Sequence, residues 1–258
     1  MKIAAWNVNS IKVRLPHVLT WLEKNQPDVL CLQELKCESD KFPYQTFQEA
    51  GYHCLVLGQK TYNGVALISR TPGQEVLLGM PDYPDSQQRV ISARFNNVRV
   101  VSAYCPNGSE VGADKYYYKL EWFNALHHYL KILLSQESHL VIGGDFNIAP
   151  TDADVHDPKA WKDKILCSPA ERAAFFDLLT LGLVDSFRLF KQPEKSWSWW
   201  DYRTGGFERQ RGLRIDHLLV SNSLASTCLE SSIDPTPRGW ERPSDHAPVW
   251  TNITPPPL

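Results

Sequence analysis

The feature that most limits the possible folds of this chain is the placement of polar residues at the ends of short apolar segments. Six such places are Trp6-Asn7, Leu32-Gln33-Glu34, Val101-Ser102-Ala103-Tyr104, Gly144-Asp145-Phe146-Asn147, Ile215-Asp216-His217 and Ser244-Asp245-His246. Burying so many polar groups costs free energy unless they bond to one another or hold an ion. A stable fold is therefore expected to bring these segment ends together.

Apolar runs and helical patterns alternate along the chain. Strands are expected at residues 2–6, 28–32, 64–69, 90–95, 97–104, 139–142, 196–200, 213–220 and 247–253. Helices are expected around residues 15–22 and 120–133, and from the capping box of Ser168 and Glu171 to near Gly182. Because strand–helix–strand units recur in both halves, the pattern predicts an α/β fold with two packed sheets flanked by helices. We expect a single domain over residues 1–258.

Composition excludes several classes of protein. The six cysteines form no C-x-x-C pair, so they are expected to be reduced thiols rather than a disulfide frame or a zinc site. No apolar run has a length that spans a bilayer and the N-terminal segment lacks a signal-peptide pattern, so a cytoplasmic protein with no membrane association is expected. The net charge of −2 argues against purely electrostatic nucleic-acid binding, although a local basic rim or a bound cation reverses the field locally.

The polar segment ends carry a defined chemistry if they converge. They contribute four carboxylates, from Glu34, Asp145, Asp216 and Asp245, together with amides, a phenol and the imidazole of His246. Carboxylate and amide oxygens without thiolates suit a hard cation such as Mg²⁺ or Mn²⁺. Such a cation beside a general base and hydrogen-bond donors equips a site to hydrolyse a phosphodiester with water.

Each of these residues also has a purely structural explanation. An acid such as Glu34 after a strand is usually a loop residue, and Asn7 and Asn147 belong to the residue type that forms turns. Tyr104 is alternatively explained as an ordinary phenol of the core, and Asp216 as a residue that caps a strand end. Their joint occurrence in this order favours the catalytic explanation.

That order resembles the exonuclease III family of apurinic/apyrimidinic (AP) endonucleases, in particular its bacterial members, within the larger endonuclease/exonuclease/phosphatase group. The matching segments are residues 6–10, 30–36, 62–67, 104–108, 143–150, 199–203, 211–216 and 242–248. The resemblance extends from residue 3 to about residue 253. It implies a four-layer α/β sandwich of two packed mixed β-sheets flanked by helices, as in DNase I.

The resemblance also implies a set of metal ligands. Glu34 would be the principal ligand, assisted by Asn7 or Asn9. Further candidate ligands are Asp145, Asn147 and Asp245. The cation would be Mg²⁺, for which Mn²⁺ substitutes.

The same resemblance assigns catalytic roles. Asp145 would orient or deprotonate the attacking water, and Asn147 would donate to the scissile phosphate. Tyr104 would face the phosphate as a donor or as a phenolate base, two alternatives that remain open at this stage. His246 would hold a phosphate oxygen while Asp216 accepts its other N–H and fixes its tautomer.

Substrate contacts follow by the same resemblance. Trp199, Leu213 and Ile215 would form an apolar pocket for a flipped-out abasic sugar, and Asn107 and Arg203 would contact DNA. The basic residues that are further candidates for phosphate contacts are Lys12, Arg14, Lys36, Arg209, Arg211 and Arg214.

The implied function is DNA repair by a metal-dependent phosphodiesterase. The expected activities are class II AP endonuclease cleavage 5′ to abasic sites, 3′→5′ exonuclease action on double-stranded DNA, and cleaning of blocked 3′ ends. Its partner would be double-stranded DNA with abasic sites or with recessed or blocked 3′ ends, bound by a monomer with nucleoid-associated activity in the cytoplasm. The alternatives are a lipid- or inositol-phosphate phosphatase of the same superfamily and a non-catalytic damage-binding protein.

Overall fold

One six-stranded sheet joins strands from the two ends of the chain in the computed structural model, which describes residues 1–255 and 257. Its order is β13–β14–β1–β2–β4–β3. The strands are β1 (Lys2–Asn7), β2 (Val29–Gln33), β3 (His53–Leu57), β4 (Val65–Ser69), β13 (Cys228–Ile233) and β14 (Val249–Ile253). Because β1 and β2 run parallel, with Asn7 opposite Gln33, their carboxyl ends meet at one edge of the sheet.

The second six-stranded sheet has the order β5–β6–β7–β8–β12–β9. Its strands are β5 (Gln74–Leu78), β6 (Val90–Phe95), β7 (Val98–Tyr104), β8 (Leu140–Asp145), β9 (Leu183–Asp185) and β12 (Asp216–Ser221). β8 runs parallel to β7 and antiparallel to β12, so Asp145 has Tyr104 on one side and Asp216 on the other.

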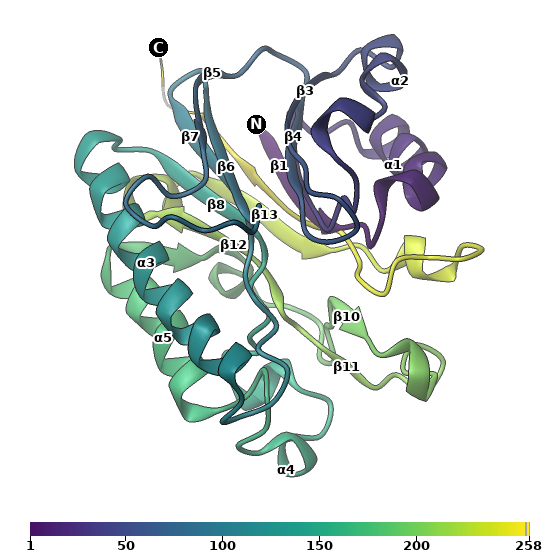
Figure 1. The fold of residues 1–258 in the computed structure, drawn as a ribbon, viewed down its shortest axis with the longest axis vertical. Coiled ribbons are helices and arrows are strands. Elements are labelled where there is room, and N and C mark those ends of the chain that lie inside the picture. Colours follow the sequence, from purple (N-terminus) through teal and green to yellow (C-terminus); the bar gives the residue numbers. More distant parts are fainter. Residues whose placement is uncertain (256, 258) are drawn as a thin grey trace.

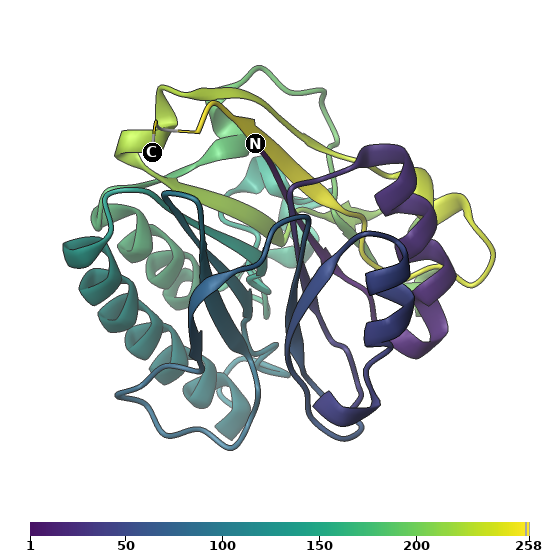
Figure 2. The same ribbon diagram turned by 90° about the horizontal axis from the view of Figure 1, so that it is seen from above.

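Helices cover the outer face of each sheet, which gives the four layers seen in Figures 1 and 2. α1 (Ile11–Asn25) and α2 (Tyr44–Glu49) pack on the first sheet, and α3 (Asp114–Gln136) and α5 (Pro169–Thr180) pack on the second. Apolar side chains of the two inner faces form a third core between the sheets. The architecture expected from the sequence is therefore confirmed.

Short elements complete the chain. They are the helices α4 (Pro158–Trp161) and α6 (Asn222–Ala225), the hairpin of β10 (Trp199–Trp200) and β11 (Gly212–Leu213), and single 3₁₀ turns at Ser39–Lys41, Asp152–Asp154, Ser186–Leu189, Tyr202–Thr204 and Thr236–Gly239. Within the described residues, no helix combines the length and the apolar character needed to cross a membrane.

Local signals placed several boundaries correctly. The Ser168 hydroxyl accepts from the backbone N–H of Glu171, and the Glu171 carboxylate accepts from the N–H of Ser168, so the predicted capping box starts α5. The strands expected at 196–200 and 247–253 are shorter, starting at Trp199 and Val249. The strand expected at 213–220 is two strands, because the chain leaves the β10–β11 hairpin at Arg214 before it joins the second sheet.

The strands that the sequence did not reveal are β3, β5, β9 and β13, which are the edge strands of the two sheets. An edge strand exposes much of its length, as β5 does, and so lacks the continuous apolar run that marks a buried strand. The strands that carry the polar segment ends are central in their sheets, and these were found.

Candidate active site

Polar side chains from several strands meet at one end of the packed sheets. Asn7 ends β1 and Glu34 follows β2, whereas Asp145 ends β8 and Asp216 begins β12. His246 lies just before β14 and forms an isolated bridge with Trp199 of the hairpin. The predicted convergence of the segment ends is confirmed.

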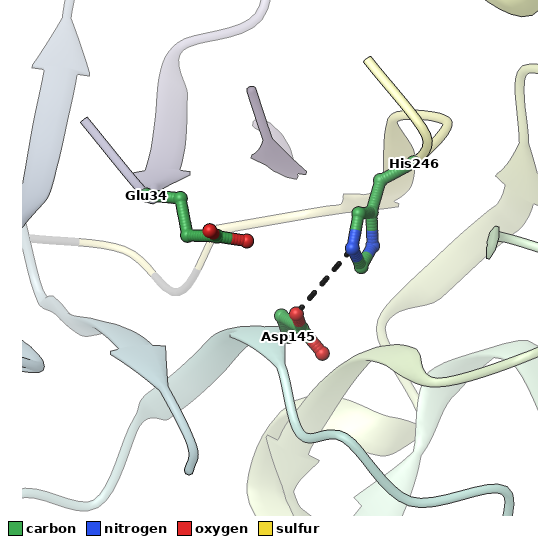
Figure 3. Close-up of side chains that lie close together, drawn as sticks. All are labelled: Glu34, Asp145 and His246. Atoms are coloured by element: carbon green, nitrogen blue, oxygen red, sulfur yellow. Dashed lines mark ion pairs between the residues drawn. The ribbon is translucent and has the colours of Figure 1, made fainter. Parts of the chain in front are cut away.

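Three of these side chains could share a cation. The carboxylates of Glu34 and Asp145 and the imidazole of His246 each offer a ligand atom, and these atoms lie within 4.8 Å of one another. Figure 3 shows the three side chains pointing toward a common point. The Asn7 amide lies between the acids, because its Nδ2 is 2.6 Å from Glu34 Oε2 and 2.9 Å from Asp145 Oδ2.

His246 is held by an acid on each side. Its Nδ1 donates to both carboxylate oxygens of Asp216, at 2.9 and 3.0 Å, which is the contact expected from the sequence. Its Nε2 lies 3.6 Å from Asp145 Oδ2. Burial lowers the pKa of His246, but the charges of Asp216 and Asp145 outweigh burial and raise it to about 10. The side chain is therefore an imidazolium at neutral pH that donates from both nitrogens, so the two carboxylates and not His246 are left to hold a cation.

Asp145 has the properties of a base that works near neutral pH. Burial raises its pKa to about 7, although the His246 charge opposes the rise, and Asp216 adds to it. Its Oδ1 accepts from the backbone N–H of Asn147 at 2.9 Å, which fixes the carboxylate plane. A carboxylate with this pKa accepts a proton from water more readily than an ordinary aspartate does.

Tyr104, in contrast to Asp145, is not suited to act as a base. Burial and the nearby carboxylates of Glu34 and Asp145 raise the pKa of its hydroxyl well above the usual value. The guanidinium of Arg89 lies 4.8 Å from the centre of the Tyr104 ring, and its Nη1 donates to the backbone carbonyl oxygen of Tyr104 at 3.0 Å. The hydroxyl thus keeps its proton, which favours the donor role over the phenolate role.

Two asparagines form a linked pair beside Asp145. Asn107 Nδ2 donates to Asn147 Oδ1 at 3.2 Å, and Asn147 Nδ2 donates to Cys105 O at 2.8 Å. Asn147 has a left-handed backbone with φ of 50°. Because an amide nitrogen carries two protons, Asn147 keeps one donor for a ligand.

Asp245 lies in a second group of contacts. Its Oδ1 accepts from Asn9 Nδ2 at 3.1 Å, and its Oδ2 accepts from Trp199 Nε1 at 3.1 Å. The ammonium of Lys36 donates to Asn9 Oδ1 at 2.6 Å and lies 3.7 Å from Glu34 Oε1. Asp245 is therefore bonded to Asn9 and Trp199, and it is not among the three residues that converge on the common point.

The apolar residues expected to bind a sugar lie together but below the surface. Leu213 and Ile215 are 0% and 1% exposed, in a cluster with Ala149, Val155, Leu166 and Cys167. Trp199 is partly exposed and packs edge-on against Trp161, with 6.5 Å between ring centres. The side chain of Arg203 is 92% exposed, on the turn that follows β10.

The expected phosphate contact of Arg214 is wrong. Its side chain is 2% exposed and pairs with Asp154 and Asp185, each at 2.7 Å. A guanidinium enclosed by two carboxylates has no free donor face for DNA. The exposed neighbours Arg209 and Arg211 made Arg214 look like a surface residue in the sequence.

The donor set fits a hard divalent cation. Glu34 and Asp145 supply carboxylate oxygens, and no thiolate is present in the group that converges. The Asn7 amide donates its Nδ2 protons to both acids, while its oxygen accepts from the backbone N–H of Asn9. Asp145 is 1% exposed, and among the described residues its one ion-pair partner is His246, which Asp216 shares, so its negative charge is incompletely neutralised. Oxygen ligands with uncompensated charge match Mg²⁺ or Mn²⁺ better than zinc.

Three neighbours of the site had no role assigned to them from the sequence. Ser244 Oγ donates to Asn7 O at 2.6 Å and accepts from the backbone N–H of His246 at 3.2 Å, so it ties the histidine loop to β1. Arg89 supports Tyr104, and Lys119 of α3 lies beneath Asn147. Only Ser244 had a signal, since it directly precedes Asp245 and His246.

Several known proteins resemble this chain in sequence and in fold. Residues 4–246 match the sequence model of the Endonuclease/Exonuclease/phosphatase family. The chain is 39% identical to Exodeoxyribonuclease III of Haemophilus influenzae, over 98% of this chain and 100% of that protein. The structure of the 3′ phosphatase NExo from Neisseria, bound to a product DNA hairpin, matches with a TM-score of 0.97 and 48% identity, over 98% and 99% of the two chains. An AP endonuclease from Archaeoglobus fulgidus matches with a TM-score of 0.94 and 38% identity, over 98% and 99%.

Proposed function

The chain belongs to the exonuclease III family of AP endonucleases, within the endonuclease/exonuclease/phosphatase family, and we propose that it repairs DNA by hydrolysing phosphate esters in damaged duplexes. Its substrates are abasic sites, cut on their 5′ side, and recessed or blocked 3′ ends. The observation that carries this proposal is the group of Glu34, Asp145 and His246, in which acids outnumber cations.

A divalent cation completes the proposed site. Glu34 would be the principal ligand of Mg²⁺, or of Mn²⁺ in its place, with Asp145 close beside it. When bound, the cation offsets negative charge on the phosphate and on the departing oxygen.

The chain supplies the other groups that the reaction needs. Asp145 orients the attacking water and takes its proton as the water oxygen bonds to phosphorus and the bond from phosphorus to the 3′ oxygen breaks. His246, Asn147 and Tyr104 donate to the phosphate oxygens, and such preorganised donors contribute about 3–4 kcal/mol each to transition-state stabilisation. Asp216 keeps His246 charged and oriented. The departing 3′ oxygen takes up a proton from solvent and becomes a free hydroxyl. The other product is a 5′ phosphate after cleavage of a phosphodiester, and inorganic phosphate after removal of a 3′ terminal phosphate.

Processing of 3′ ends is the main activity in this proposal. Leu213 and Ile215, which would receive a flipped sugar, are fully covered, whereas a 3′ terminal phosphate needs only the polar end of the site. The likeness to a 3′ phosphatase at 48% identity supports the same order of activities. Incision at abasic sites then requires the cluster under Trp199 to open.

The direct experiment compares two DNA duplexes. One carries a single tetrahydrofuran abasic analogue and the other an undamaged recessed 3′ end, each incubated with Mg²⁺ or with EDTA. We expect cleavage of both with Mg²⁺, none with EDTA, and the faster rate at the recessed end. Cleavage in EDTA, or none with Mg²⁺, rejects the function, and a faster abasic cut rejects the order of activities.

The same assay separates the alternatives. A soluble inositol polyphosphate and a phosphoinositide vesicle test the lipid- or inositol-phosphate phosphatase, and turnover of either in preference to DNA would favour it. Binding of the abasic duplex without any turnover in Mg²⁺ would favour the damage-binding protein.

A further inference from the structure

A buried ammonium lies beneath the loops that follow β7 and β8. Lys119 of α3 is 0% exposed, and its Nζ lies 2.6 Å from Asn147 O, 3.1 Å from Asn107 O and 2.5 Å from Glu171 Oε1. An ammonium has three donors, so all of them are used. Lys119 is not one of the groups that contact the phosphate or the attacking water in the proposed reaction.

The partner carboxylate is itself fixed. Glu171 is 0% exposed, and its oxygens also accept from the backbone N–H groups of Leu166 and Ser168, at 3.0 and 3.1 Å. Glu171 therefore anchors Lys119 to the first turn of α5. A buried ion pair of this kind is a poor source of net stability, because desolvation offsets much of the attraction. Its position needs another explanation.

The two carbonyls that Lys119 binds belong to the linked asparagines of the site. Asn107 and Asn147 bond to each other through their side chains, and the backbone N–H of Asn147 also fixes Asp145. The left-handed φ of Asn147 is a conformation that few residues adopt without support. A cation on the Asn147 carbonyl holds the peptide plane, and with it the direction of the side chain.

Gly108 shows how closely Lys119 is enclosed. A Cβ at Gly108 would lie 3.0 Å from Lys119 Cδ, and the residue has a φ of 89°, which favours glycine. The stem of Lys119 thus runs directly under the Asn107-Gly108 turn. No other side chain on α3 makes hydrogen bonds to both loops among the residues that the structure describes.

We propose that Lys119 is a positioning residue for phosphate-ester hydrolysis, which fixes Asn147 and Asn107 by binding both of their backbone carbonyls. The proposal rests on the function proposed above. It predicts that Lys119 affects the reaction through Asn147. It also predicts that replacing Lys119 and Glu171 together by neutral residues lowers the activity, although no buried charge is then left unpaired.

The test compares two variants on the recessed 3′ end with saturating Mg²⁺. Glu171→Gln removes the charge partner but leaves both carbonyl contacts, so we expect a lower Tm and a kcat close to wild type. Lys119→Met with Glu171→Gln removes both buried charges, so we expect a Tm at or above that of Glu171→Gln. We expect kcat to be lower by roughly 10- to 100-fold, with KM little changed, because small misplacements of reacting groups have effects of that size. Equal kcat in the two variants overturns the proposal.

A double-mutant cycle separates positioning from general structural damage. If Lys119 acts through Asn147, then adding Lys119→Met and Glu171→Gln to Asn147→Ala changes kcat less than about 3-fold. Fully additive losses contradict the proposal. Should the combined variant fail to fold, Lys119→Arg decides instead, because it keeps the charge but cannot repeat both carbonyl contacts in the same enclosed space; wild-type kcat in a folded Lys119→Arg protein contradicts the proposal.

The matched control is Lys131→Met, at an exposed position near the other end of the same helix. This variant should keep wild-type kcat and Tm, and a loss there would show that removing any α3 lysine is harmful. A wild-type protein that does not cleave DNA at all rejects the proposed function instead, so the two failures are distinguishable.

Discussion

Strand β12 separates two buried groups of charged side chains that differ in their balance of charge. Asp216 begins the strand and belongs to the catalytic group, where Glu34, Asp145 and Asp216 face the imidazolium of His246. The next residue, His217, points to the other face and into a network with Arg214, Asp154 and Asp185, which Arg188 joins. In this network two arginines match two aspartates.

The difference appears in the pKa values of two aspartates that are both buried. Burial would raise the pKa of Asp154, but Arg214 outweighs it and the pKa is lowered to about 2. Burial raises the pKa of Asp145 to about 7, because His246 alone does not compensate. In a balanced group each charge depends on its partner, so loss of one partner is destabilising. An unbalanced group marks a place where a cation or substrate belongs.

The largest expected effect is on catalysis, from Asp145→Asn. The substitution preserves shape but removes the base, so we expect kcat on a recessed 3′ end to fall roughly 10²- to 10⁴-fold, the usual contribution of general-base catalysis. Single-turnover cleavage with Mg²⁺ measures it. A loss below 3-fold would mean that Asp145 is not the base.

The Tm of Asp145→Asn tests whether the catalytic group carries unbalanced charge. At pH 8 in EDTA the ionised Asp145 is unfavourable in the folded state, so Asp145→Asn should raise Tm by roughly 2–4 °C, as expected for a gain of about 1 kcal/mol in a protein of this size. The gain should shrink as the pH falls through about 7, where wild-type Asp145 becomes protonated. A lower Tm at pH 8 would contradict the idea that the catalytic group carries unbalanced charge.

The opposite result is expected in the balanced network. Arg214→Met leaves Asp154 and Asp185 without their main partner, and removing one member of a buried ion pair lowers the free energy of unfolding by about 3–5 kcal/mol. Urea unfolding measures this change, and kcat per folded molecule should stay within a few-fold of wild type. Unchanged stability would show that the network does not depend on its balance.

The dependence of stability on pH distinguishes the two buried histidines. The pKa of His246 is raised to about 10, so its stabilisation is complete below pH 6.5 and is lost as the pH rises through 10. Burial and the Arg214 charge lower the pKa of His217 to about 4, so stability is lost as the pH falls from 6.5 through 4.

Profiles of Tm against pH in EDTA test these signs. His246→Asn should flatten the alkaline side of the profile only, and His217→Leu the acid side only. Each effect amounts to a few kcal/mol over the full titration. A profile that changes on the same side for both variants would contradict the assignment of charge to the two groups.

The parts of the molecule that were predictable share one physical property. Central strands are buried on both faces and read as apolar runs, so polar ends such as Asn7, Asp145 and Asp216 were visible in the sequence. The missed edge strands lack that signal, since β5 is exposed along most of its length and β9 has only three residues.

The missed and misplaced residues depend on tertiary partners. Lys119 falls within an amphipathic helix and meets Asn147 only after the chain folds, and Arg89 meets Tyr104 across the β6–β7 pair. Arg214 was placed on the surface because its carboxylate partners lie 60 and 29 residues away in sequence. Spacing along a chain carries no information about such partners.

Binding of Mn²⁺ tests most directly whether the unbalanced acids form a cation site. Isothermal titration of the wild-type protein, Glu34→Gln and the control Glu38→Gln compares a converging carboxylate with an exposed one nearby that pairs with Lys41. The account predicts saturable Mn²⁺ binding in the wild type, the same binding in Glu38→Gln, and at least a 10-fold weaker affinity in Glu34→Gln. No saturable binding in the wild type, or equal affinity in all three proteins, would contradict it.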